Sequence, residues 1–266
     1  MTRERGKHTR MDILEHNRDG WNQHVAEGDQ WTLPVDAATI VRARKGDWTV
    51  ALTPTKPVPR EWFGDIAGKD ILGLASGGGQ QMPILAAAGA HVTSFDASDA
   101  QLGQDRKVAN REGLDIRTVQ GFMHDLSAFA DESFDLIFHP CSNCFAPEIM
   151  PVWRECARVL RPGGILLAGF VNPVNFIFDW KALDAGKLIA RHPLPYRDLD
   201  VPEEELAELI RQNKTLEFSH TLYEQMGGQM AAGLHMTAMF EDTWAELDAL
   251  SRLYDPFIAT RSIRPA

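Results

Sequence analysis

Between residues 70 and 170 the chain alternates short apolar runs with stretches whose apolar positions recur every three to four residues. The runs have the length of strands and lie at 70–74, 91–95, 116–120, 134–138 and 165–170. Most of the stretches between them carry the period of amphipathic helices. Strands that alternate with helices in this way predict βαβ units and therefore a parallel sheet.

The boundaries of these helices also have sequence signals. Gly89 ends the helix that follows the first strand, and Ser98 is placed to cap the next helix, which should run to Gly113. Gln101 stands three residues after Ser98 and completes the pattern of a capping box. The run at 134–138 is apolar apart from one aspartate, which is typical of a buried parallel strand.

The C-terminal part adds two more strands, at 235–240 and 257–262, and a helix over 223–231. Pro202, followed by three glutamates, predicts the start of a further helix, since proline and negative charge both favour a helix N-terminus. We therefore expect an α/β fold with a doubly wound, mostly parallel sheet of seven strands.

The N-terminal part lacks this alternation. Residues 1–63 are interpreted as a tail followed by a partly helical cap, and residues 64–266 as the main domain, with 172–215 as a lid over an acceptor pocket. The region contains Trp21, Trp31, Trp48 and Trp62, four of the seven tryptophans. They are either packing anchors or, for one or two of them, walls of a ligand pocket.

Composition limits the choice of partners. The 266 residues carry a formal net charge of −10, which disfavours nucleic acid as a partner. The basic N-terminus reads as a solvated tail, and no stretch is long and apolar enough to span a membrane. The odd count of three cysteines gives no disulfide framework, so we expect a reduced, cytoplasmic protein. The sequence leaves a homodimer open.

The turn after the first strand holds the strongest candidate chemistry. Three consecutive glycines, Gly77–Gly79, precede a helix start. Their spacing does not match the G-x-G-x-x-G fingerprint, which disfavours a nicotinamide oxidoreductase, and no Gly-Lys-Ser/Thr follows for a triphosphate. Asp96 ends the second strand, where an acid can accept hydrogen bonds from both hydroxyls of a ribose.

Four blocks together resemble the class I S-adenosylmethionine-dependent methyltransferases, whose fold is Rossmann-like. They are the loop at 74–79, the ribose block at 95–98, the fourth strand at 133–138 and the segment at 154–164, which ends in Pro-Gly-Gly. The last block is similar to the family pattern E-x-x-R-V-L-x-P-G-G. The resemblance covers 70–170 well and the rest of the chain loosely.

The resemblance implies a binding site for S-adenosylmethionine. Its cofactor-binding residues would be Ala75, Ser76, Gly77, Gly78, Gly79, Gln80, Gln81, Asp96, Ala97, Phe122, Met123 and His139. The chain departs from the family pattern in three places. Gly73 replaces an acid, Ala75 replaces the first glycine and would permit close approach at a negative φ, and residues 121–123 replace an acid near the adenine.

The predicted function is methyl transfer to an unidentified small-molecule acceptor by in-line displacement. Candidate general bases are His139, His220 and His24, and candidate acceptor contacts are Trp21, Asn143, Asn172 and His220. Cys141 and Cys144 form a C-x-x-C pair, but a zinc site needs two further ligands, so no metal is expected. The alternative is a protein that binds S-adenosylmethionine or S-adenosylhomocysteine without catalysis.

Overall fold

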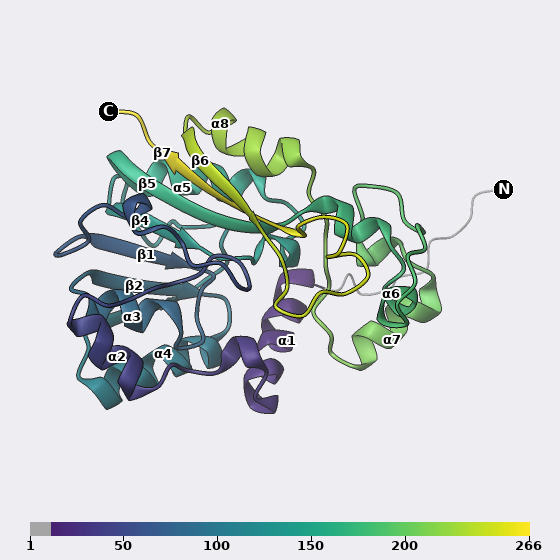
Figure 1. Ribbon diagram of the computed structural model, residues 1–266, viewed down its shortest axis with the longest axis horizontal. Coiled ribbons are helices and arrows are strands. Elements are labelled where there is room, and N and C mark those ends of the chain that lie inside the picture. Colours follow the sequence, from purple (N-terminus) through teal and green to yellow (C-terminus); the bar gives the residue numbers. More distant parts are fainter. Residues whose placement is uncertain (1–11) are drawn as a thin grey trace.

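The computed structural model describes residues 12–266, so the predicted basic tail lies outside the described residues. Seven strands form one sheet in the order β3-β2-β1-β4-β5-β7-β6 (Figure 1). The strands are β1 Asp70–Leu74, β2 His91–Asp96, β3 Ile116–Gln120, β4 Phe134–His139, β5 Leu160–Val171, β6 His235–Asp242 and β7 Phe257–Ile263. The first five pair in parallel, and β7 runs antiparallel to β5 and β6. The predicted mostly parallel, seven-stranded sheet is confirmed.

Helices cover both faces of this sheet. The α-helices are α1 Ile13–Glu27, α2 Ala37–Arg44, α3 Gln81–Ala87, α4 Asp99–Glu112, α5 Met150–Val159, α6 Trp180–Asp184, α7 Glu203–Arg211 and α8 Gly228–Ala231. A π-helical turn, Tyr223–Gly227, precedes α8, and short 3-10 helices occupy Gln30–Thr32, Arg60–Trp62, Asn143–Phe145, Pro173–Ile177 and Asp198–Asp200. In Figure 1, α2, α3 and α4 lie together on one side of the strands.

The core consists of two layers because successive strand residues point to opposite faces. Ile71 and Phe138 pack with α3 and the 48–66 segment, whereas Leu72 and Ile137 pack with α5 and its Trp153. Trp48 and Trp62 belong to the first layer and are 7% exposed. The end of the predicted cap region thus packs into the same core as the sheet, and two of its four tryptophans are packing anchors.

The predicted capping box at α4 forms only in part. Ser98 Oγ accepts the hydrogen bond from the Gln101 backbone N–H at 3.0 Å, as expected. The reciprocal bond from Gln101 is missing, because the Ser98 N–H donates instead to Asp96 Oδ1 at 2.9 Å. The carboxylate at the end of β2 is therefore fastened to the start of α4.

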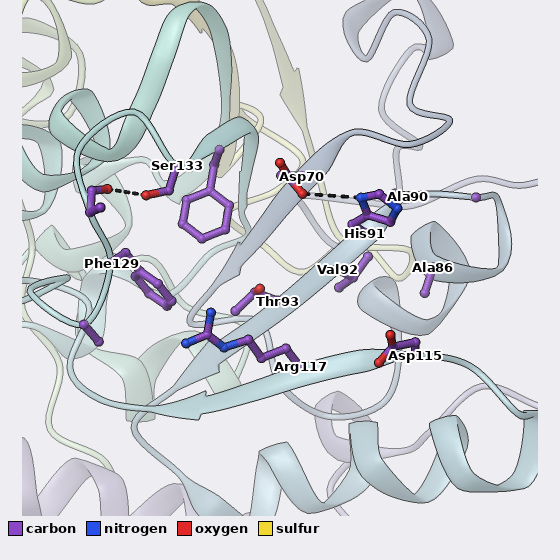
Figure 2. A pocket seen from close by; sticks show the side chains of 14 residues that line it. Asp70, Ala86, Ala90, His91, Val92, Thr93, Asp115, Arg117, Phe129 and Ser133 are labelled. Atoms are coloured by element: carbon purple, nitrogen blue, oxygen red, sulfur yellow. Dashed lines mark hydrogen bonds and ion pairs between the residues drawn. The ribbon is translucent and has the colours of Figure 1, made fainter.

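A cavity of about 570 Å³ lies at the amino ends of the strands, where Figure 2 shows Asp70, His91, Asp115 and Arg117 around it. The Asp70 carboxylate is held there by Arg161, whose Nη2 lies 2.8 Å from Oδ2, and by His91, whose Nδ1 lies 3.4 Å from Oδ1. Ligands of open α/β sheets bind at the opposite, carboxyl ends of the strands. This cavity is therefore not the candidate active site.

Candidate active site

The second cavity, of about 900 Å³, opens at the carboxyl ends of the strands. One side is formed by the glycine loop, the end of β2 and residues 122–124. The other side comes from α1, the loop after β4, the 171–184 segment and residues 198–217. In the view of Figure 1, α1 lies between the sheet and the part of the chain that carries α6 and α7. The cavity thus joins the predicted cofactor loop to the predicted acceptor region.

The three glycines are required mainly by packing of the loop against α4. A Cβ at Gly77 would lie 2.7 Å from Gln101 Cβ. At Gly79, where φ is +73°, a Cβ would lie 2.9 Å from both Pro34 Cβ and the Gln104 carbonyl oxygen. Of the predicted loop residues, Ala75, Ser76, Gly77, Gln80 and Gln81 line the cavity. Gly78 and Gly79 are buried behind this wall.

Asp96 lines the cavity at the end of β2, and its carboxylate is fixed by two backbone donors. Oδ2 accepts from Gly77 N at 3.0 Å and Oδ1 from Ser98 N at 2.9 Å. Burial raises the pKa of Asp96 to about 6, against the lowering effect of these bonds. A carboxylate oxygen can accept more than one hydrogen bond, so Asp96 can still receive the hydroxyls of a ribose.

Asp105 is a site residue that the sequence reasoning missed. Its fully buried carboxylate accepts from Gly79 N at 2.9 Å and from Ser94 Oγ at 2.6 Å. Burial raises the pKa of Asp105 to about 7. A signal was present, since Asp105 follows the buried Gln101 by four residues and precedes the buried Val108 by three, which places it on the inner face of α4.

The departures from the family pattern have steric explanations. A Cβ at Gly73 would lie 2.2 Å from Met82 Sδ and 2.4 Å from Ser76 Oγ, so these atoms occupy the space of the missing side chain. Ala75 has φ +47°, which corrects the expectation of a negative φ at this position. The Ser76 hydroxyl is buried in the cavity wall and has no hydrogen-bond partner among residues 12–266.

The predicted adenine side is an apolar slot. Phe122 and Met123 line the cavity together with Ala97 and His124. The Phe122 ring stacks on the His124 ring with centroids 6.0 Å apart. A Cβ at Gly121 would lie 2.4 Å from Phe95 Cζ, so the Phe95 ring fills the space in which a side chain at 121 would begin.

His139 is buried at the end of β4, and both of its ring nitrogens have protein partners. Nδ1 lies 2.9 Å from the Leu74 carbonyl oxygen and Nε2 lies 2.8 Å from the Asn143 side-chain amide. The Asn143 amide is bonded in turn to the Gln225 side chain at 2.8 Å. Burial lowers the pKa of His139. His139 and Asn143 hold the strand end and the following loop together from behind the cavity wall.

The other predicted acceptor residues are divided between the wall and the interior. His220 is buried, and its Nε2 lies 3.1 and 2.9 Å from the carbonyl oxygens of residues 143 and 146. Asn172 caps a 3-10 helix through Val174 N at 3.1 Å. His24 and Trp21, both on α1, do line the cavity. Of the three candidate bases, only His24 therefore faces the cavity, and its Nδ1 lies 3.4 Å from Asp29.

The C-x-x-C pair contributes apolar thiols to the wall. Cys141 and Cys144 line the cavity, and burial raises the pKa of both thiols. At neutral pH they are protonated and are poor nucleophiles and metal ligands. Among the described residues, 12–266, histidine, cysteine and acidic side chains form no group of three that could hold a metal ion.

Comparison with known proteins shows the family. Residues 72–168 match the model of a methyltransferase domain. The chain is 47% identical over 253 residues to an uncharacterised methyltransferase of Bacillus subtilis strain 168, YbaJ, with 95% of this chain and 98% of the relative covered. It is 31% identical over 170 residues to a ubiquinone biosynthesis O-methyltransferase of Xanthomonas oryzae pv. oryzae, covering 60% of this chain and 69% of the relative.

Two solved structures share the fold. An S-adenosylmethionine-dependent methyltransferase from Mesorhizobium loti has a TM-score of 0.61 and 16% identity, over 77% of this chain and 95% of that chain. A Burkholderia thailandensis 1,6-didemethyltoxoflavin-N1-methyltransferase, with bound 1,6-didemethyltoxoflavin and S-adenosylhomocysteine, has a TM-score of 0.58 and 14% identity, over 95% and 89% of the two chains. The chain belongs to the class I S-adenosylmethionine-dependent methyltransferases, and its cofactor is S-adenosylmethionine.

The residues at the carboxyl ends of the strands fit this cofactor. Asp96 offers a fixed carboxylate at the tip of β2, Ser76 offers an unbonded buried hydroxyl, and Phe122 offers an aromatic face. These groups are suited to a ribose, a polar methionine end and a purine ring, respectively.

Proposed function

We propose that the protein transfers the methyl group of S-adenosylmethionine to a small organic acceptor bound in the same cavity. The observation that carries this proposal is that one cavity contains both Asp96 with the glycine loop and a chamber with aromatic walls. Phe145, Phe176 and Trp180 line that chamber. Ligand pockets are mostly apolar with few polar groups, and this chamber has that character.

In this proposal the cofactor lies over residues 75–81, with its ribose at Asp96 and its adenine beside Phe122 and Met123. The acceptor lies between α1 and the 172–215 lid, in contact with Trp21. His139, Asn143 and His220 act from behind the wall, as positioning residues that hold the loop after β4. Alignment of the acceptor atom with the methyl carbon and sulfur supplies much of the catalysis.

The names of the relatives support an acceptor of low molecular weight. One relative is named for an O-methyltransferase reaction in ubiquinone biosynthesis, and one solved neighbour is named for a compound bound beside S-adenosylhomocysteine. The non-catalytic binder is not favoured, because the relatives are named as methyltransferases. The described residues include no helix that is long and apolar enough to cross a membrane.

Titration calorimetry and methyl-transfer assays test the proposal together. We expect heat of binding with S-adenosylmethionine and S-adenosylhomocysteine and none with NAD. We then expect transfer of labelled methyl from S-adenosylmethionine to at least one compound of a small-metabolite panel. Cofactor binding with no transfer to any compound, but with transfer to RNA or protein, would contradict the small-molecule acceptor.

A further inference from the structure

The acceptor side of the cavity contains a half-buried carboxylate that no protein group neutralises, whereas Asp184, which also lines this side without a partner among the described residues, is exposed. Glu217 lines the cavity, and its side-chain oxygens have no hydrogen-bond or ion-pair partner within residues 12–266. Buried acids are ordinarily paired or hydrogen-bonded, because burial of a charge without a partner is costly. An unpaired carboxylate in a cavity wall is therefore available to a ligand.

The backbone around Glu217 is fixed on both sides. Glu217 N donates to Asp198 Oδ2 at 2.6 Å, and Phe218 N donates to the Cys144 carbonyl oxygen at 2.8 Å. Leu216 and Phe218 are 0% and 2% exposed. Neighbouring residues of an extended segment project to opposite sides, so burial of Leu216 and Phe218 in the interior turns Glu217 toward the cavity.

The same contacts place Glu217 beside the loop that follows β4. Cys144 belongs to this loop, and the charge of Glu217 contributes to the raised pKa of its thiol. In the methyltransferase fold the loop after the fourth strand lies at the carboxyl edge of the sheet, where ligands bind. Glu217 therefore lies on the acceptor side of the cavity, beside the loop that follows β4.

The electrostatic surroundings of Glu217 keep part of its population protonated. Burial, with a contribution from the charge of Asp198, raises the pKa of Glu217 to about 7. The Asp198 carboxylate itself accepts hydrogen bonds from Glu217 N and from the Tyr196 hydroxyl. The other titratable groups that line the cavity are Asp198, Cys141, Cys144, Arg18, His24, Asp184, Lys214, Asp248, Asp96 and His124.

None of the basic groups in that wall neutralises Glu217. Arg18 pairs with Glu15 and Asp19, and His24 pairs with Asp29. Lys214 is exposed, and neither Lys214 nor His124 forms an ion pair within the described part of the chain. A general base works best when its pKa lies near the working pH, so a pKa of about 7 suits Glu217 to a reaction near neutral pH.

We propose that Glu217 is the general base of the methyl transfer, and that the nucleophilic oxygen or nitrogen of the acceptor carries a proton. The aromatic side chains that line the acceptor chamber favour a ring-bearing acceptor. The inference rests on the proposed function. The acceptor atom gives its electron pair to the methyl carbon, and the carbon–sulfur bond breaks with its pair remaining on sulfur. The proton of the acceptor atom passes to a Glu217 carboxylate oxygen, which balances the charge.

The test compares Glu217→Gln with wild type and with Glu61→Gln, a matched change at an exposed glutamate away from the cavity. The probe is methyl-labelled S-adenosylmethionine with a deproteinised small-metabolite extract. We expect Glu217→Gln to bind S-adenosylmethionine as wild type does and to transfer label roughly 100-fold or more slowly. The Glu61→Gln variant should match wild type in both measurements.

Two readouts separate a base from a structural residue. The wild-type transfer rate should rise with pH through about 7, whereas the residual rate of Glu217→Gln should lack this rise. Carbon-13 NMR of glutamate-labelled protein should show one carboxyl that titrates near pH 7 and is missing in Glu217→Gln.

The possible failures are distinguishable. No label transfer by wild-type protein would overturn the proposed function and, with it, the role of Glu217. Equal transfer by wild type and Glu217→Gln, or titration of Glu217 near the ordinary pKa of a glutamate, would overturn only the assignment of the base.

Discussion

Asp96 holds two parts of the fold together and, in the proposed complex, also binds the ribose of the cofactor. Its two oxygens fasten the glycine loop and the start of α4 through Gly77 N and Ser98 N. The same carboxylate faces the cavity at the tip of β2. Loss of its oxygens should therefore weaken cofactor binding and also release the glycine loop and the start of α4.

We expect Asp96→Ala to weaken binding of S-adenosylmethionine by about 1–3 kcal/mol, because buried hydrogen bonds are left unmade. Calorimetric titration measures the change, and Asp115→Ala, at an exposed aspartate beside the other cavity, is the control. For wild type, affinity should fall as pH drops below about 6, because the raised pKa of Asp96 makes the carboxyl neutral there. A pH-independent affinity in wild type would contradict the ribose contact.

Ala75 is a second residue whose conformation only the structure shows. Its φ of +47° lies in the left-handed region, which costs a residue with a Cβ roughly 1–2 kcal/mol. The family pattern places glycine here. Glycine relieves this strain but gives a more flexible unfolded chain, at a cost of roughly 0.5–1 kcal/mol.

Ala75→Gly is therefore expected to leave the free energy of unfolding unchanged or raise it by up to about 1 kcal/mol. The matched change Ala207→Gly, at an exposed position inside α7, should lower it by roughly 0.5–1 kcal/mol. Urea unfolding of both variants measures the difference. An equal loss in the two variants would show that Ala75 is not strained.

At the scale of elements, the glycine loop is attached to the end of β2 and to α4. Gly77 N bonds to Asp96, Gly78 N to the Gln101 carbonyl oxygen at 3.0 Å, and Gly79 N to Asp105. The loop is thus shaped before any ligand arrives, and less conformational entropy is lost when the cofactor binds. Asp105 is the deepest of these attachments.

Replacement of Asp105 tests this attachment. Asp105→Ala leaves Gly79 N and the Ser94 hydroxyl without a partner, so we expect a loss of roughly 1–3 kcal/mol in unfolding free energy. Asp105→Asn keeps an acceptor for Gly79 N and should lose less. The affinity for S-adenosylmethionine should follow the same order in calorimetry. Equal stability of the alanine and asparagine variants would contradict the role of Asp105.

At the scale of the whole molecule, the carboxyl ends of the strands concentrate acids that burial makes costly to ionise. The pKa values of Asp96, Asp105 and Glu217 are raised to about 6, 7 and 7. An acid with a raised pKa binds more protons in the folded than in the unfolded state, so its contribution to stability falls as pH rises. His139 and His220, with lowered pKa values, act in the opposite direction.

Comparison of Glu217→Gln with wild type isolates one of these groups. At pH 4 the two proteins should have similar stability, because Glu217 is protonated in the folded state and largely so in the unfolded state. Above pH 7, Glu217→Gln should be more stable by on the order of 2 kcal/mol, because it removes a charge from a half-buried position in the cavity wall. Thermal unfolding between pH 4 and 8 measures this difference, and Glu61→Gln should follow wild type throughout. A stability difference between Glu217→Gln and wild type that becomes smaller as pH rises would contradict the raised pKa of Glu217.

Local pattern was sufficient for the order of elements and for several residues that line the cavity beside the glycine loop. The strands at 70–74 and 116–120 were predicted with their observed bounds, and β2, β4, β6 and β7 were predicted to within two residues. β5 begins earlier than predicted, at Leu160, because the Pro-Gly-Gly turn is continuous with the strand. Asp96 and the glycine loop were predictable because a strand, its turn and the next helix start are contiguous in sequence.

The sequence by itself determined the methyltransferase sheet, the glycine loop and the acid at the tip of β2, since each depends on periodicity and spacing within a short stretch. Only the tertiary structure decided that His139 and His220 are bonded behind the wall while His24 faces the cavity. It likewise brought Glu217 beside Cys144 and Asp198, and Asp105 beneath Gly79. The groups that contact a histidine or glutamate side chain come from segments far apart in the chain, and no local sequence pattern encodes such contacts.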